Sequence, residues 1–173
     1  TLHTNATTGA LRIQSGRVFN ATASGGNFTN AGLLELTDGT FTSNTLASNG
    51  NIVSFGTSTV TTGAGNRITG NGAIVANIGT LTLTRGVDMG AGSSMTSNAG
   101  ATIDLSGATQ ASRIATLNNN GSLNLGAQNL VVSKDYTNAN FGTGNAFDRR
   151  ANVSGAGQLI GENAAQTITG AVT

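Results

Sequence analysis

The sequence predicts an all-β protein, a parallel β-helix (β-solenoid) of about eight coils. The main observation is a phrase that recurs along the chain: a turn with Gly or Asn-Gly, a strand in which polar and apolar residues alternate, and another turn. Its clearest copy is Asn120-Gly121-Ser122-Leu123-Asn124-Leu125-Gly126, and residues 79–83 and 32–36 nearly repeat it. The alternation predicts that Leu123 and Leu125 point into a core, whereas Ser122 and Asn124 point outward.

The spacing between copies supports a solenoid. Leu11 and Leu34 are 23 residues apart, Leu81 and Ile103 are 22 apart, and Ile103 and Leu123 are 20 apart. A period of about 20 residues that drifts by a few suits stacked coils whose corners accept insertions. A β-sandwich also contains many short strands, but the repetition of one phrase in register favours the solenoid.

The composition fits a narrow core with many polar corners. Only 9% of the residues are charged, against about a quarter in an ordinary domain, so uncharged polar side chains must cover most of the surface. The chain has no proline, which interior strands exclude because their backbone N–H groups are needed for pairing. Gly and Asn supply the positive φ angles that corners require, and Asn repeated at one corner can stack into an amide ladder.

The charge balance argues against some classes of partner. The net charge is +1, so neither nucleic acid nor an anionic membrane surface is implied. No apolar run approaches the roughly 18 residues that a membrane span requires. The single histidine, His3, has no cysteine or acid pair beside it, and we expect no metal and no cofactor.

The expected strands come in groups of three, one group for each coil. In residues 1–31 the inward positions are Leu11/Ile13, Val18/Phe19 and Phe28. In residues 32–62 they are Leu34/Leu36, Phe41, Leu46, Ile52/Val53/Phe55 and Val60. In residues 63–105 they are Ile68, Ile74/Val75, Ile78, Leu81/Leu83, Val87/Met89, Met95 and Ile103/Leu105.

The pattern breaks after the apolar strand Leu130-Val131-Val132, and we expect a protruding loop or an irregular coil at 134–150. Three of the seven aromatic residues and five of the fifteen charged residues lie in 126–152. This segment is the candidate interaction loop, with Lys134, Asp135, Tyr136, Phe141, Phe147, Asp148, Arg149 and Arg150. Its aromatic rings could stack on carbohydrate or plug a widened coil, and we favour the plug.

The Asn-x-Gly-x-Leu-x-Leu phrases, the abundance of Thr, Asn and Gly, and the lack of Cys and Pro resemble large bacterial surface proteins. The similar families are the filamentous haemagglutinin-like proteins and the passenger β-helices of autotransporters. The resemblance implies a secreted or cell-surface, right-handed parallel β-helix that serves as a stalk, adhesin or fibre, with host or matrix glycans as partners. No functional residue of these families maps onto a motif here.

A carbohydrate-active β-helix, such as a polysaccharide lyase or a tailspike-like hydrolase, is the alternative function. It would need clustered acids with a basic residue beside them. Coil stacking could bring Asp88 near Asp104, and the local candidate is Asp135 with Asp148, Arg149 and Lys134. We favour a salt-linked loop for this local group and expect no enzyme activity.

Threonine rows suggest a further alternative, an ice-binding solenoid. Thr59-x-Thr61 and Thr80-x-Thr82-x-Thr84 resemble the regular rows of that class. Such a surface needs the same pattern on successive coils, and we expect Arg12, Glu35 and Asn124 to occupy the corresponding positions. Since these residues would interrupt the row, the threonines are interpreted as ordinary outward strand residues.

The two ends of the chain would fit each other. Residues 168–173 followed by 1–5 would continue the same phrase, and neither end carries a charged cap of the kind that solenoids use. We therefore expect residues 1–173 to form one solenoid segment that stacks end to end, either with other copies or as a part of a longer chain.

Overall fold

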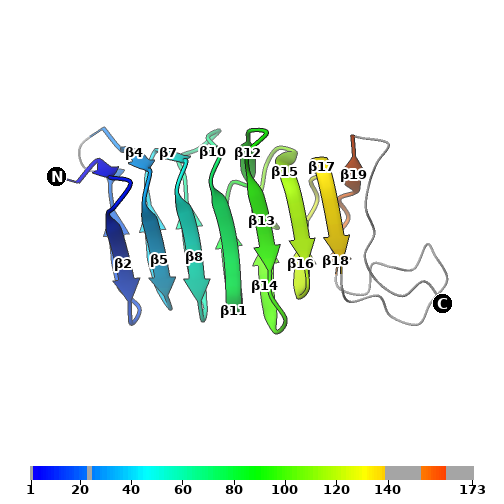
Figure 1. Ribbon diagram of the computed structural model, residues 1–173, viewed down its shortest axis with the longest axis horizontal. Coiled ribbons are helices and arrows are strands. Elements are labelled where there is room, and N and C mark those ends of the chain that lie inside the picture. Colours follow the sequence, from blue (N-terminus) through cyan, green and yellow to red (C-terminus); the bar gives the residue numbers. More distant parts are fainter. Residues whose placement is uncertain (1, 23–24, 139–152, 163–173) are drawn as a thin grey trace.

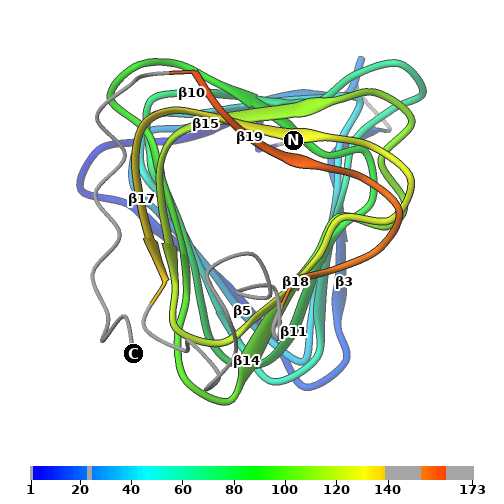
Figure 2. The same ribbon diagram turned by 90° about the vertical axis from the view of Figure 1, so that its right-hand side faces the viewer.

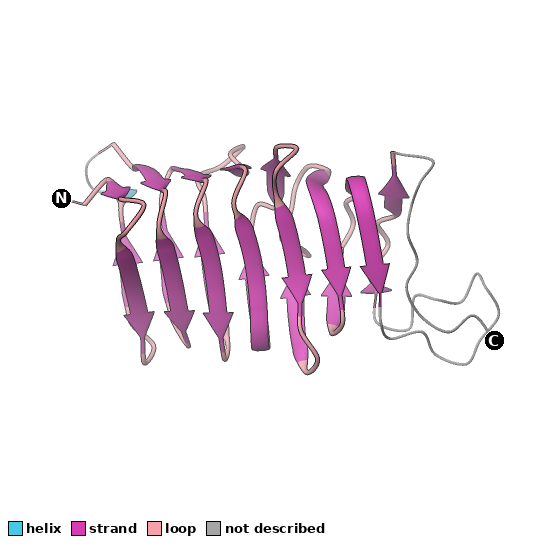
Figure 3. Cartoon of the chain, in the orientation of Figure 1, coloured by secondary structure: helices cyan, strands magenta, loops and turns pink. Residues whose placement is uncertain are grey.

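The protein is an all-β solenoid in which every strand pairing is parallel, as the sequence predicted (Figure 1). The computed structural model describes residues 2–22, 25–138 and 153–162. These contain nineteen β-strands and no α-helix, joined by short loops (Figure 3). Viewed along the rod, the strands enclose a triangle (Figure 2). One coil of the chain therefore crosses three walls, which confirms the expectation of three strands in each coil.

The strands of each wall lie side by side in a parallel ladder. The first wall consists of β2 (Ala10–Gln14), β5 (Leu33–Thr37), β8 (Asn51–Phe55), the first part of β11 (Ala73–Leu83), β13 (Ser94–Ser97), and the second parts of β15 (Ser112–Asn119) and β17 (Leu130–Asn138). The second wall consists of β3 (Val18–Asn20), β6 (Thr40–Thr42), β9 (Ser58–Thr61), the second part of β11, β14 (Ala101–Asp104), β16 (Ser122–Asn124) and β18 (Val153–Ser154). The third wall consists of β1 (Thr4–Asn5), β4 (Asn27–Asn30), β7 (Thr45–Ser48), β10 (Ile68–Gly70), β12 (Val87–Met89), the first parts of β15 and β17, and β19 (Leu159–Gly161).

The register confirms the spacing that predicted the fold. Leu11 pairs with Leu34, Leu81 with Ile103, and Ile103 with Leu123. The number of turns is about six, so the expected eight was too many. The prediction divided the whole chain by one period, whereas residues 139–152 and 163–173 lie outside the described part. The step between the paired Leu130 and Leu159 is also longer than an ordinary coil.

The core is a set of side-chain columns that run along the rod. One column on the first wall stacks Leu34, Ile52, Ile74, Met95 and Leu117, all fully buried. Such columns form because equivalent residues in a parallel ladder lie directly above one another. Leu123 and Leu125 are buried and Ser122 and Asn124 are half-buried on the outside, as the alternation predicted.

Several expected inward residues instead face outward. Val18, Phe55 and Ile78 are 65%, 37% and 59% exposed. Val53 and Val75 are half-buried on the outer face. The pleat is the reason, since a strand that buries Ile52 must turn Val53 outward. Ile78 follows a shift in register between Ala76 and Ile78, at the corner between the first and second walls.

The corners use glycine and asparagine, as expected. Gly56 and Gly79, between the first and second walls, have φ angles of 71° and 72°. Between the third and first walls, Asn5 Nδ2 donates to Asn30 Oδ1 at 2.7 Å. Asn30 Nδ2 donates to Ser48 Oγ at 3.0 Å and to the carbonyl of Asn51 at 3.1 Å. The amide ladder therefore spans two coils and passes to a serine in the third.

We expect replacement of Asn30 by leucine to lower the free energy of unfolding by about 2 kcal/mol, because the ladder loses its buried central amide and the Asn51 carbonyl loses that donor. Asn30 is 0% exposed. Asn27, on the same strand, is exposed, and Asn27→Leu is the matched control. Chemical denaturation of the two variants checks this, and equal losses would contradict a special role for the buried amide.

Candidate functional site

The third wall carries a row of ionic side chains. Arg67 Nη2 lies 2.6 Å from Asp88 Oδ2, and Arg67 Nη1 donates to the carbonyl of Ala111 at 2.5 Å. One coil further, Arg113 lies beside Asp88 in the ladder. Both terminal nitrogens of Arg113 bind the carboxylate of Glu162, with Nη1 2.7 Å from Oε1. The row thus consists of two ion pairs: Arg67–Asp88 joins neighbouring coils, whereas Arg113–Glu162 reaches across the coil of β17.

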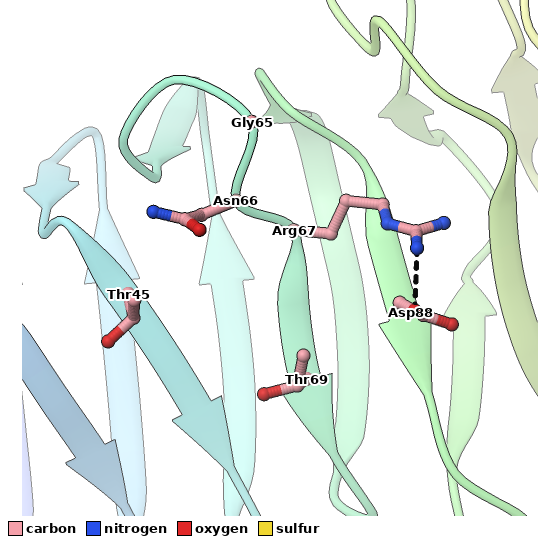
Figure 4. Close-up of a pocket in the computed structure, with 6 residues that line it drawn as sticks. All are labelled: Thr45, Gly65, Asn66, Arg67, Thr69 and Asp88. Atoms are coloured by element: carbon pink, nitrogen blue, oxygen red, sulfur yellow. Dashed lines mark hydrogen bonds and ion pairs between the residues drawn. The ribbon is translucent and has the colours of Figure 1, made fainter.

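The Arg67–Asp88 pair borders a shallow pocket (Figure 4). Its lining residues are Thr45, Gly65, Asn66, Arg67, Thr69 and Asp88. The volume is about 270 Å³, smaller than most sites for small molecules. Asn66 is engaged in the loop, because its Nδ2 donates to the carbonyl of Asn44 at 3.0 Å. The pocket offers polar groups to a ligand, but its carboxylate already neutralises a guanidinium.

Glu162 raises the pKa of the Arg113 guanidinium above its ordinary value, through their hydrogen bonds first and through its negative charge second. Arg113 is thus a cation whose Nη1 and Nη2 each donate to the carboxylate of Glu162. An anionic substrate would have to displace this carboxylate, so the pair is better suited to linking coils than to binding an anion.

Among the described carboxylates, Asp88 and Glu162 share the third wall, whereas Glu35 lies on the first wall and Asp104 on the second. The expectation that stacking could bring Asp88 near Asp104 is wrong, because Asp88 lies on the third wall and Asp104 on the second. Asp104 Oδ1 accepts a hydrogen bond from the backbone N–H of Ser106 at 2.9 Å. His3 is exposed, with Nδ1 3.4 Å from the carbonyl of Asn27. Within the described ranges, no three His, Cys, Asp or Glu side chains form a group that could hold a metal ion.

The expected interaction loop is only partly within the described chain. Lys134 is exposed, and strand β17 continues past it to Asn138. The backbones of Asp135 and Tyr136 pair with Thr116 and Leu117 on the first wall. The irregular segment therefore does not begin at 134, because the strand continues for five residues from there. Phe141, Phe147, Asp148, Arg149 and Arg150 lie outside the described residues.

The second wall carries a feature that sequence reasoning dismissed. Seven outward threonines, which we call the threonine rank, lie on four successive strands: Thr40, Thr42, Thr59, Thr61, Thr80, Thr82 and Thr102. Arg12 and Glu35 do not interrupt the rank, because they lie on the first wall and pair with each other at 3.2 Å. Asn124 is on the second wall but follows Asp104, beyond the rank. The corner lengths decide which wall each strand joins, and the sequence phrase does not reveal them.

No helix in the described ranges is both long and apolar enough to cross a membrane. Comparisons of the chain with protein-family models, with curated proteins and with solved structures found no match.

Proposed function

We propose that this chain is a non-catalytic structural or adhesive module of a bacterial extracellular fibre or cell-surface stalk, whose rods stack end to end. The edge of the first described coil carries this proposal, because it fits a further parallel coil from another copy or from a longer chain. Within the described residues, β1, β2 and β3 pair only with β4, β5 and β6. Their other edges offer backbone donors and acceptors to a further parallel coil.

The side chains at this end support stacking. Leu11 and Phe19 are only partly buried, whereas Leu34 and Phe41, one coil further in the same columns, are 0% exposed. Leu2, which precedes the first strand, is 44% exposed. Another coil on this face would cover apolar surface. Burial of apolar surface contributes about 25 cal/mol of favourable free energy for each Å². Unprotected strand edges are prone to such pairing.

The ion pairs of the third wall suit a structural role. Arg67–Asp88 and Arg113–Glu162 each join different coils, and so tie the rod together along its length. The bacterial, extracellular setting and the glycan partners rest on the resemblance carried by the repeated phrases, the abundance of Thr, Asn and Gly, and the lack of Cys and Pro.

An edge-blocking substitution tests the stacking. In the ladder between β2 and β5, the N–H of Leu33 donates to the carbonyl of Gly9, and the N–H of Ser15 donates to the carbonyl of Thr37. Successive residues of a strand point their backbone N–H groups to opposite edges, so the N–H of Ala10 points toward the open edge. We expect the unmodified chain to form extended rods in electron micrographs and to sediment faster as its concentration rises. Ala10→Pro, which removes that N–H, should shift the population to single short rods, whereas Ala10→Ser should not. Short rods at every concentration, for the unmodified chain, would contradict the proposal.

A further inference from the structure

We propose that the threonine rank on the second wall binds the surface of ice. The rank is in register over successive coils. Thr40 pairs with Thr59, and Thr59 with Thr82. Beside this column Thr42 pairs with Thr61, and Thr80 pairs with Thr102. The registers therefore place the threonines in a two-dimensional array. The strands that carry them form one side of the triangle seen along the rod (Figure 2).

The array has the repeat distances of a β-sheet. Neighbouring strands are about 4.8 Å apart, and alternate residues along one strand are about 6.6 Å apart. Threonine is stiff at χ1, so equivalent side chains can share one orientation and present a hydroxyl and a methyl group at each point. Water molecules in an ice plane also repeat in two dimensions at distances of this order, whereas a dissolved small molecule does not.

The hydroxyl groups of the rank are available to water. Each of these threonines is half-buried, and the inward residues between them, such as Phe41, Val60 and Leu81, are 0%, 1% and 0% exposed. No described residue forms a side-chain hydrogen bond with any hydroxyl of the rank. β9 is held between β6 and β11 by ladders on both sides. Because this wall is ordered before it meets a surface, binding requires little further ordering.

The chemistry of the rank favours ice over a charged or aromatic-binding partner. The seven threonines form an uncharged patch without aromatic rings, and the first charged residue in their columns is Asp104, which pairs with Thr82. The other two walls lack such uniformity. The first wall mixes Arg12, Glu35 and Val53 on its outer face, and the third wall carries the ion pairs of Arg67 and Arg113.

The test uses the full chain and measures the freezing-point hysteresis and the growth of ice grains in a frozen solution. We expect the unmodified chain to depress the freezing point below the melting point and to stop grain growth. Thr59→Tyr puts a ring in the middle of the longest column and should abolish most of both effects. Thr96→Tyr is the matched control, because Thr96 is a half-buried outward residue of the first wall. It should retain both effects, and tyrosine is well tolerated in strands.

Circular dichroism and thermal melting establish that both variants are folded. Absence of any effect on ice by the unmodified chain would overturn the proposal, and so would equal losses in the two variants. A third outcome would also overturn the proposal. If the unmodified chain binds crystalline chitin or cellulose but has no effect on ice, and Thr59→Tyr abolishes that binding, the threonine rank binds a polysaccharide. The result is independent of end-to-end stacking, which Ala10→Pro tests separately.

Discussion

Phe41→Ala is expected to lower the free energy of unfolding by about 3–5 kcal/mol, the range for removal of a buried aromatic ring. Phe41 is 0% exposed and belongs to a cluster of three phenylalanines near one end of the rod. Its ring stacks on Phe19 with centroids 5.6 Å apart, and meets the edge of Phe28 at 5.0 Å. Alanine would leave a cavity where second- and third-wall strands meet, and the parallel ladders on both sides limit its collapse.

Urea denaturation followed by circular dichroism measures this loss. The matched control is Phe55→Ala, because Phe55 lies on the outside of the first wall and is 37% exposed. We expect the control to cost about 1 kcal/mol or less, as for surface substitutions in general. A solenoid can unfold from one end, so the Phe41 variant should also show a broader transition. Equal destabilisation by the two variants would refute a core role for Phe41.

Gly72→Ala is expected to lower the free energy of unfolding by about 3 kcal/mol, the upper end of the range for overpacking. Gly72 lies at the corner between the third and first walls, in a column with Gly50 and Gly32. A Cβ at Gly72 would overlap the carbonyl oxygen of Gly50, and a Cβ at Gly50 would overlap that of Gly32. Backbone atoms cannot move aside as a flexible side chain would, so the coils must separate locally.

The control for this substitution is Gly92→Ala. A Cβ at Gly92 would have its nearest neighbour, Asn71 Cβ, at 3.4 Å, an ordinary van der Waals contact. Differential scanning calorimetry should show a lower melting temperature for Gly72→Ala and little change for Gly92→Ala. If both variants melt with the parent chain, the glycine column is not required for close stacking of the coils.

The features of this chain that its sequence predicts are those that depend on short-range alternation or on regular recurrence of the same phrase. Alternation over a few residues is local, and it placed Leu123, Leu125, Leu34 and Leu36 in the core. Recurrence of the phrase predicted the pairing of Leu11 with Leu34. Both signals work because a parallel ladder repeats the same environment at each coil.

The errors lie where several apolar residues are adjacent or where a corner changes length. Ile52, Val53 and Phe55 cannot all face inward from one pleated strand, and only Ile52 is buried. Ile78 follows a register shift that no local sequence pattern predicts. The Arg67–Asp88 pair also escaped prediction, because the two residues are 21 apart in sequence and meet only through coil stacking.

The sequence by itself therefore determined the fold class, the parallel register and the alternation of its strands, since these depend on periods of two and of about twenty residues. The tertiary structure decided which wall each strand joins, because corners of different length rotate the chain by an amount that no residue pattern encodes. That assignment moved Arg12 and Glu35 to the first wall. It left seven threonines together on the second wall.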